Sequence, residues 1–295
     1  MSVLEQLVLR ASDKTQFEKI EDYFSFCREY LAFATGGLQA VIVSRNEPHY
    51  RFYQYKEDGN YNITRPINSD IMVTAIEFDS MLETFRYALA HIHEVKDPDD
   101  RACINHIVYT CQQSIGATLD ALPAGKSNTA RKLNGDLFER FIQLLLIEIG
   151  VDVRSGTVQV PVIVDDVSLF NMSYQQDLII EKDGNLLAIG SVKTSSKDRL
   201  GKIFIDKFLH NRLTEVNTPH FAIFLNDIQR AGKEPNFGVN STFLTGHFKG
   251  FTIKLNPLDG VYYCDMRPNM KTDFILKEHI KTLDCLFIED IWKFQ

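Results

Sequence analysis

The chain has 295 residues, of which 44% are hydrophobic and 24% are charged. This composition is typical of a globular protein with an ample core, built as one large domain or as a core with an arm. The formal net charge of −7 argues against binding nucleic acid through a uniformly basic surface. A cleft can still be locally basic on an acidic protein.

The sequence shows no sign of a membrane-spanning or secreted protein. No stretch approaches 18 consecutive apolar residues, and the first ten residues carry charges without a long apolar run. The five cysteines are scattered, odd in number and without the spacing of a metal site. We therefore expect reduced thiols, a cytoplasmic location and no membrane partner.

Residues 1–125 are expected to form a mostly helical N-terminal arm. Apolar residues recur at helical spacing over 3–34, and further helices are predicted at 71–95 and 100–122. Strands are predicted at 38–43 and 48–56. The second of these is aromatic and basic, which fits a strand packed on the core or a DNA-facing segment that stacks on a base.

Residues 126–295 are expected to form an α/β catalytic core. A helix is predicted at 134–146, and the polar residues before it form a linker or turn. Apolar runs predict strands at 158–164, 220–225, 248–255 and 261–264, and apolar spacing predicts a helical tail over 274–292.

The stretch from Tyr174 to Asn211 carries the main chemical signal. Asp177 leads one apolar run, the turn Lys182-Asp183-Gly184-Asn185 follows, and a second apolar run ends on Lys193. Asp-Gly between apolar runs predicts a β-hairpin, which brings a carboxylate and a lysine to one end of a small sheet. A carboxylate that binds a divalent cation, beside a lysine that orients or deprotonates a water, can hydrolyse a phosphodiester.

The second acid of such a site is expected on the next helix. Ser191 stands two residues before the lysine, where an acid is usual. A helix is predicted from about Lys197 to Leu213, on which Asp198, Lys202 and Asp206 would share one face at i, i+4 and i+8. A carboxylate from that helix would fill the space left by the missing acid.

The run Ser191-Val192-Lys193, followed by Lys197-Asp198-Arg199 and Asp206, resembles a family of type II restriction endonucleases. These enzymes, of the EcoRII, SsoII and PspGI kind, cut sites containing CCGG, CCNGG or CCWGG. Their nuclease motif is permuted, with Ser-x-Lys in place of Glu-x-Lys and the acid supplied by the next helix. The resemblance covers about 132–227 and implies a restriction-endonuclease-like fold, a mixed central sheet flanked by helices.

The resemblance also implies roles for individual residues. Asp177 and Asp206 would hold Mg²⁺, with Glu139 in support. Lys193 would position or activate the attacking water. Ser191 would be a neighbour in the site and not a nucleophile, because no histidine lies near it in sequence. Where this chain has Asp206 the family usually has Glu, so the shorter side chain would hold the metal differently or through water.

Two assignments stay open in the sequence. Asp165 or Asp166, which follow the strand at 158–164, could replace Asp177 as the metal ligand. Glu139 could be a surface residue paired with Arg140 or Lys132.

Lys197, Asp198 and Arg199 are the predicted base-reading residues. Arg or Lys can donate to guanine in the major groove and Asp can accept from cytosine N4, although a solvated first helical turn is the alternative. The resemblance implies a site with CC and GG halves, with CCNGG or CCWGG favoured over CCGG. A palindromic site calls for a homodimer.

The predicted function is therefore Mg²⁺-dependent, sequence-specific cleavage of double-stranded DNA, with a cognate DNA methyltransferase in the same system. One alternative is a repair or recombination nuclease that cuts by structure. Another is a non-catalytic DNA-binding protein with a degenerate nuclease core, which the serine at 191 and the acidic charge would suit.

Overall fold

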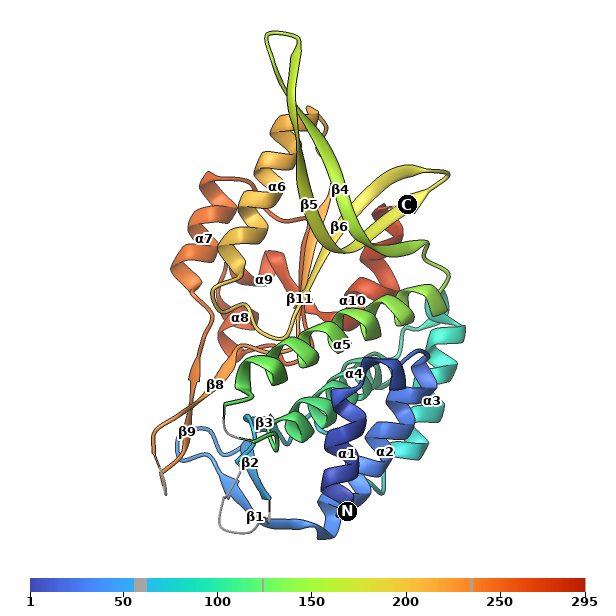
Figure 1. The fold of residues 1–295 in the computed structure, drawn as a ribbon, viewed down its shortest axis with the longest axis vertical. Coiled ribbons are helices and arrows are strands. Elements are labelled where there is room, and N and C mark those ends of the chain that lie inside the picture. Colours follow the sequence, from blue (N-terminus) through green and yellow to red (C-terminus); the bar gives the residue numbers. More distant parts are fainter. Residues whose placement is uncertain (56–62, 124, 234–235, 295) are drawn as a thin grey trace. The chain divides into compact units, whose positions relative to one another are not determined.

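The computed structural model describes residues 1–55, 63–123, 125–233 and 236–294 (Figure 1). The chain packs as two compact units, Met1–Leu144 with Asp227–Thr242, and Leu145–Asn226 with Phe243–Gln295. The functional division expected at residue 125 stays a prediction. Among the described residues, no helix combines the length and apolar character needed to cross a membrane, and all five cysteines are free thiols.

The first unit contains a buried helix, α4 (Pro98–Leu119). Asp97 caps its start and Pro98 begins it, where a missing amide donor costs no hydrogen bond. The helices α1 (Val3–Ser12), α2 (Ile20–Gly36) and α3 (Phe78–Ala90) pack against α4. The helix predicted at 71–95 is therefore shorter than expected, and it is followed by the short 3-10 helix η2 (Ile92–Glu94).

Two small sheets complete the first unit. The strands β1 (Leu38–Val43), β2 (Tyr50–Tyr55) and β3 (Ile67–Asn68) are antiparallel, and β8 (Ile228–Ala231) pairs with β9 (Gly238–Ser241). The rings of Tyr50, Phe52 and Tyr55 are buried, at most 1% exposed. The core-packing interpretation of this strand is thus confirmed, and the idea that these three rings receive a base is wrong. Residue 56, the last of the predicted strand, lies outside the described residues.

The second unit is built on a six-stranded mixed sheet of order β11-β10-β7-β6-β5-β4. The strands β4 (Val153–Val164), β5 (Val167–Lys182) and β6 (Asn185–Lys193) are antiparallel. The strands β6, β7 (His220–Phe224), β10 (Gly260–Tyr263) and β11 (Ile280–Thr282) run parallel. The predicted fold class, a mixed sheet with helices, is confirmed.

Helices cover both faces of this sheet. On one face α6 (Leu200–Thr214) and α7 (Thr245–Lys254) pack through Phe204 and Phe248 against Ala222 and Phe224. On the other face Phe294, in the C-terminal turn Ile291–Phe294, stacks on Phe221 at 5.6 Å between ring centroids. The long helix α5 (Ser127–Glu148) spans the boundary of the two units. Short helices complete the second unit: α8 (Pro268–Thr272), α9 (Leu276–His279) and α10 (Leu283–Cys285), the last followed by the π-helical turn Leu286–Asp290.

Two predicted elements are wrong. The stretch predicted as a strand at 248–255 belongs to α7, because the parallel strands β7 and β10 need a crossover connection between them. The tail over 274–292 is not one helix. It is interrupted by β11, whose Ile280 pairs with Val261 in the sheet.

Candidate active site

Ser191 and Lys193 point to the face of the sheet that α6 covers. Ser191 pairs with Ala222 and Lys193 with Phe224 on the neighbouring parallel strand, and both of those partners pack in the α6 core. Gly190 lies on the opposite face, where an added Cβ would stand 2.5 Å from the Phe221 ring. The strand therefore requires glycine there, and it presents the lysine at its carboxyl end on the α6 side.

The register of β5 against β6 places Asp177 on the same face, because Leu178 pairs with Gly190 on the opposite one, and a β-bulge follows toward Tyr174. Arg154 pairs with Ile179 but Gly156 pairs with Gln176, so two β5 residues oppose one β4 residue at this point. The bulge reverses the alternation of side chains along β5. As a result Tyr174, whose ring contacts His210 of α6, faces α6 as Asp177 does.

Asp177 and Lys193 form an ion pair across the hairpin, as predicted. The Oδ2 atom of Asp177 accepts a hydrogen bond from Lys193 Nζ at 2.5 Å and one from the Val192 amide at 2.8 Å. The two side chains are 14% and 27% exposed. Both of these hydrogen bonds use Oδ2.

The hairpin exists because its turn favours one backbone geometry. Asp183 and Gly184 both have positive φ, 52° and 78°, which is the two-residue turn that matches the twist of the flanking strands. The turn fixes the register of β5 against β6, and that register sets Asp177 beside Lys193.

Asp206 faces β5 from α6. It lies one turn before His210 on the helix, and the His210 ring contacts Tyr174 of β5. Burial first, and the charge of Asp206 second, raise the pKa of the Tyr174 hydroxyl. Asp206 is 20% exposed and forms an ion pair with Lys202, one turn earlier on the helix. The structure thus brings Asp206 to the face of the sheet that carries Asp177 and Lys193.

The loop between β6 and α6 differs from the prediction. The helix begins at Leu200, not at Lys197, because the amides of Arg199 and Leu200 donate to the Ser196 carbonyl at 3.0 and 3.1 Å. Asp198 adopts a left-handed φ of 58°. It therefore does not share a helix face with Lys202 and Asp206, and that part of the predicted spacing is wrong.

The three predicted base-reading residues stand on this loop. Lys197, Asp198 and Arg199 are all exposed, directly after the strand that ends on Lys193. Their role in reading DNA stays a prediction.

The alternative carboxylates are not brought to the site. Asp165 and Asp166 form the turn between β4 and β5, with φ of 49° and 64°. At about 3.3 Å per residue, the length of β5 from that turn separates them from Asp177 by more than ~30 Å. The alternative in which they replace Asp177 is therefore wrong.

Glu139 lies on the part of α5 that belongs to the first unit, so its distance from the hairpin is not defined. Arg140 donates to the carbonyl oxygens of Lys14 and Phe17. The supporting role of Glu139 stays a prediction.

The donor set fits a hard divalent cation. Asp177 and Asp206 offer carboxylate oxygens, and Mg²⁺ is usually bound by one or two carboxylates while it keeps several waters. Across the described ranges, no three His, Cys, Asp or Glu side chains gather in a way that could hold a metal ion. Mg²⁺ held by Asp177 and Asp206 would therefore need waters for its remaining ligands.

A buried polar cluster behind the site was missed by sequence reasoning. Lys207 Nζ donates to Asp259 Oδ2 at 2.7 Å and to the Pro257 carbonyl at 2.6 Å, and the His220 amide donates to the same carboxylate oxygen at 2.6 Å. These bonds tie α6 to the loop before β10 and to β7, and so fix the helix that carries Asp206. The signal was a lysine on the otherwise apolar inner face of α6, where a charge needs a partner.

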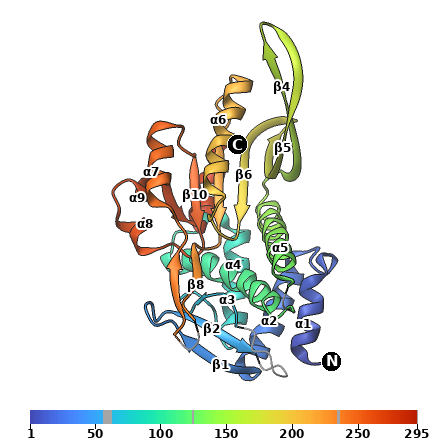
Figure 2. The same cartoon turned by 60° about the vertical axis from the view of Figure 1, so that its left-hand side comes forward.

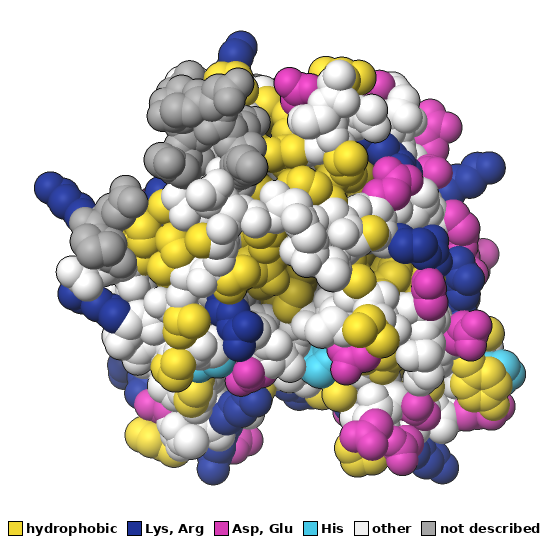
Figure 3. All heavy atoms as spheres, turned by 90° about the horizontal axis from the view of Figure 1, so that it is seen from below, with side chains coloured by type: hydrophobic (Ala, Val, Ile, Leu, Met, Phe, Trp, Pro, Cys, Tyr) yellow, Lys and Arg dark blue, Asp and Glu magenta, His cyan; other side chains and the backbone are white. Residues whose placement is uncertain are grey.

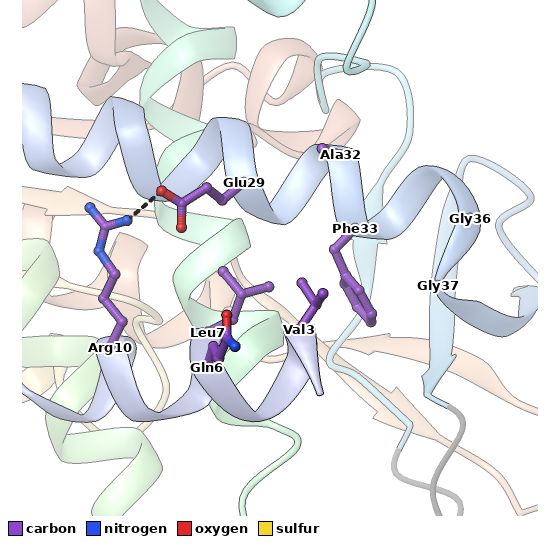
Figure 4. A pocket seen from close by; sticks show the side chains of 9 residues that line it. All are labelled: Val3, Gln6, Leu7, Arg10, Glu29, Ala32, Phe33, Gly36 and Gly37. Atoms are coloured by element: carbon purple, nitrogen blue, oxygen red, sulfur yellow. Dashed lines mark hydrogen bonds and ion pairs between the residues drawn. The ribbon is translucent and has the colours of Figure 1, made fainter. Parts of the chain in front are cut away.

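A pocket of about 820 Å³ lies between α1 and α2 in the first unit (Figure 4). Its Arg10 is paired with Glu29 at 2.8 Å. None of the predicted site residues lines this pocket. On the face shown in Figure 3, Lys and Arg side chains are interspersed with Asp and Glu, so neither sign dominates that face.

Comparison with known proteins shows the fold. No family model and no curated protein sequence matches the chain. Among solved structures, the type IIP restriction endonuclease Kpn2I is similar with a TM-score of 0.74 and 17% identity, over 100% of this chain and 98% of that one. The specific restriction endonuclease AgeI in its DNA complex gives a TM-score of 0.38 and 10% identity, over 72% and 86%. The chain therefore has the fold of the type IIP restriction endonuclease Kpn2I.

Proposed function

We propose that this chain is a type II restriction endonuclease that cleaves double-stranded DNA at a specific palindromic site with Mg²⁺. The observation that carries the proposal is the Asp177–Lys193 pair on the α6 face of the sheet, with Asp206 on the adjoining helix. The full-length similarity to Kpn2I, described as a type IIP restriction endonuclease, supports it.

The proposed roles follow from charge and placement. Asp177 and Asp206 hold Mg²⁺, which when bound polarises a phosphate oxygen and lowers the pKa of a bound water. Lys193 orients the attacking water and stabilises the negative charge that develops on the phosphate. Asp177 in turn holds the lysine ammonium in place through Oδ2. Ser191 faces the same side as Lys193 and is not a nucleophile.

The exposed loop after Lys193 supplies the proposed base contacts. Lys197 and Arg199 donate to guanine and Asp198 accepts from cytosine, which suits adjacent G·C pairs. We propose a site with CC and GG halves, interrupted as in CCNGG or CCWGG. A homodimer places one active site on each strand of such a palindrome. A methyltransferase of the same specificity would protect the DNA of the host.

Digestion of DNA of known sequence tests the proposal. Plasmid and genomic DNA are incubated with the purified chain in the presence of Mg²⁺, with a parallel reaction that contains a chelator. Discrete fragments that depend on Mg²⁺ are expected. A smear, or nicks at junctions, would instead indicate a nuclease that cuts by structure. DNA binding without metal-dependent turnover would indicate a non-catalytic protein.

A further inference from the structure

The strands β4 and β5 form a long two-stranded ribbon. From Gly156 paired with Gln176 to Val164 paired with Val167, the two strands bond to each other, whereas β6 pairs with β5 only from Leu178 onward. Figures 1 and 2 both show this ribbon reaching past the end of α6. Its base packs on α6 through Tyr174, but a two-stranded ribbon without further packing is marginally stable in water, so the outer part is expected to be covered by a partner.

The outer part of the ribbon exposes apolar side chains on both of its faces. In a strand with one face buried and one face exposed to solvent, hydrophobic residues alternate with polar ones. In this ribbon, residues next to each other in the sequence are both apolar and both exposed. Five such side chains, each between 51% and 59% exposed, lie on this outer part, which we call the ribbon tip: Ile163, Val164, Val167, Leu169 and Phe170. A contiguous exposed patch of this kind marks an interaction site.

The acidic charge of the ribbon indicates which class of partner it can bind. Residues 155–181 contain no Lys or Arg, and Asp165 and Asp166 form the turn at the tip. DNA phosphates would be repelled by such a tip and would find no cation on it. The ribbon therefore suits a protein surface that is apolar and basic.

The outer side of α6 is such a surface. Lys202, Ile205, Phe208 and Arg212 are exposed and lie along one side of the helix. Ile205 is 48% exposed and Phe208 41%, so the stripe has an apolar centre with a cation at each end. Its composition complements the ribbon tip, which has an apolar body and an acidic end.

We propose that the ribbon tip of one copy docks on the α6 stripe of a second copy, and the reverse, to form a symmetric dimer. The apolar side chains of the tip cover Ile205 and Phe208, and Asp165 and Asp166 pair with Arg212. Because each copy carries one tip and one stripe, two equivalent contacts form at once, as in an isologous interface. The proposal names the surface of the homodimer in the proposed function, but its test does not depend on cleavage.

Sedimentation velocity of the full chain over a range of concentrations tests the dimer. The wild type is expected to dimerise, and Leu169→Asp/Phe170→Asp and Phe208→Asp are each expected to raise the dissociation constant at least roughly 100-fold. Ile76→Asp is the matched control, because Ile76 is 95% exposed and lies outside both surfaces. The tip variant mixed with the helix variant is expected to form a heterodimer, since one tip and one stripe remain intact in that pair.

Charge reversal gives an independent test that leaves the apolar side chains in place. Asp165→Lys/Asp166→Lys is expected to weaken the dimer, and adding Arg212→Glu in the same chain is expected to restore it. A wild type that stays monomeric, or tip and helix variants that dimerise like the wild type, would overturn the proposal. A tip variant that loses DNA affinity without any change in association would place the ribbon on DNA and overturn it equally.

Discussion

The carboxylate of Asp177 accepts a hydrogen bond from the Lys193 ammonium at 2.5 Å, across two adjacent strands of one hairpin. Two local features create this contact. The turn at Asp183-Gly184 sets the register, and the pairing of Leu178 with Gly190 in that register leaves the Asp177 side chain on the α6 face. A paired carboxylate and ammonium at the end of a strand are the groups that metal-assisted hydrolysis of a phosphodiester requires.

Asp177→Asn should abolish most cleavage while the fold stays intact. The amide keeps the size of the side chain and still accepts from the Val192 amide, but it removes the negative charge that holds the cation. A loss of roughly 10²–10³ in the single-turnover rate is expected, the size seen when one electrostatic group is removed from an active site. Asp183→Asn is the control, since asparagine tolerates the positive φ of the turn. Wild-type rates for Asp177→Asn would show that the assignment is wrong.

Asp206→Ala should lose most activity, and Asp206→Glu should keep part of it, because the longer carboxylate still reaches the same space. Lys202→Ala is the matched control, since it breaks the ion pair and leaves the acid in place. Ser191→Glu combined with Asp206→Ala should restore some cleavage, because residue 191 faces the same side as Lys193. If Asp206→Ala cuts normally, Asp206 is an ordinary helix-surface acid.

Stability should fall as the pH drops from about 6.5 to about 4. Burial lowers the pKa of His220 from its ordinary value of 6.5 to about 4. At a pH between these two values the unfolded chain binds a proton at His220 and the folded chain does not, so protonation favours unfolding. The loss reaches at most roughly 3 kcal/mol. His210, Lys207 and Asp259 also face His220. Chemical denaturation at several pH values should show a flatter dependence for His220→Gln than for the wild type.

His93→Gln, a substitution of an exposed histidine, is measured beside it as the control. Equal slopes for His220→Gln and the wild type would contradict the account.

Arg199→Ala should cost roughly 1–3 kcal/mol of specific DNA binding, the usual worth of one base-edge contact. Lys254→Ala, an exposed cation on α7, is the control for a general loss of positive charge. The ends of fragments cut from a genome of known sequence should carry CC and GG around the cut. Ends without them would refute the base-reading role and leave the nuclease assignment standing.

Much of the fold follows from local sequence signals. The Asp-Gly turn predicted the hairpin, and the polar break at Lys96-Asp97-Pro98-Asp99 marked the start of α4. A continuous apolar run predicted the buried β7. These features depend on turn chemistry, capping and periodicity, which a single sequence displays.

The rest depends on contacts that no local pattern shows. The apolar residues of α7 also suit a strand, and only the need for a crossover between β7 and β10 decides for a helix. The bulge at Asp177 arises from pairing with β4, which lies earlier in the chain. The left-handed Asp198 lies before the helix, which begins at Leu200 and not at Lys197 as predicted. The role of Asp206 was predicted by resemblance, whereas the packing of its helix on the sheet required the structure.

The rate of Mg²⁺-dependent DNA cleavage by Lys193→Ala tests the central claim most directly. Lys182→Ala, which removes a lysine from the other end of the same hairpin, is measured beside it. The wild type and Lys182→Ala should cut DNA into the same discrete fragments at similar rates. Lys193→Ala should bind DNA and unfold at the wild-type denaturant concentration, yet leave the DNA uncut. Cleavage by Lys193→Ala at the wild-type rate, or no metal-dependent cleavage by the wild type, would contradict the account.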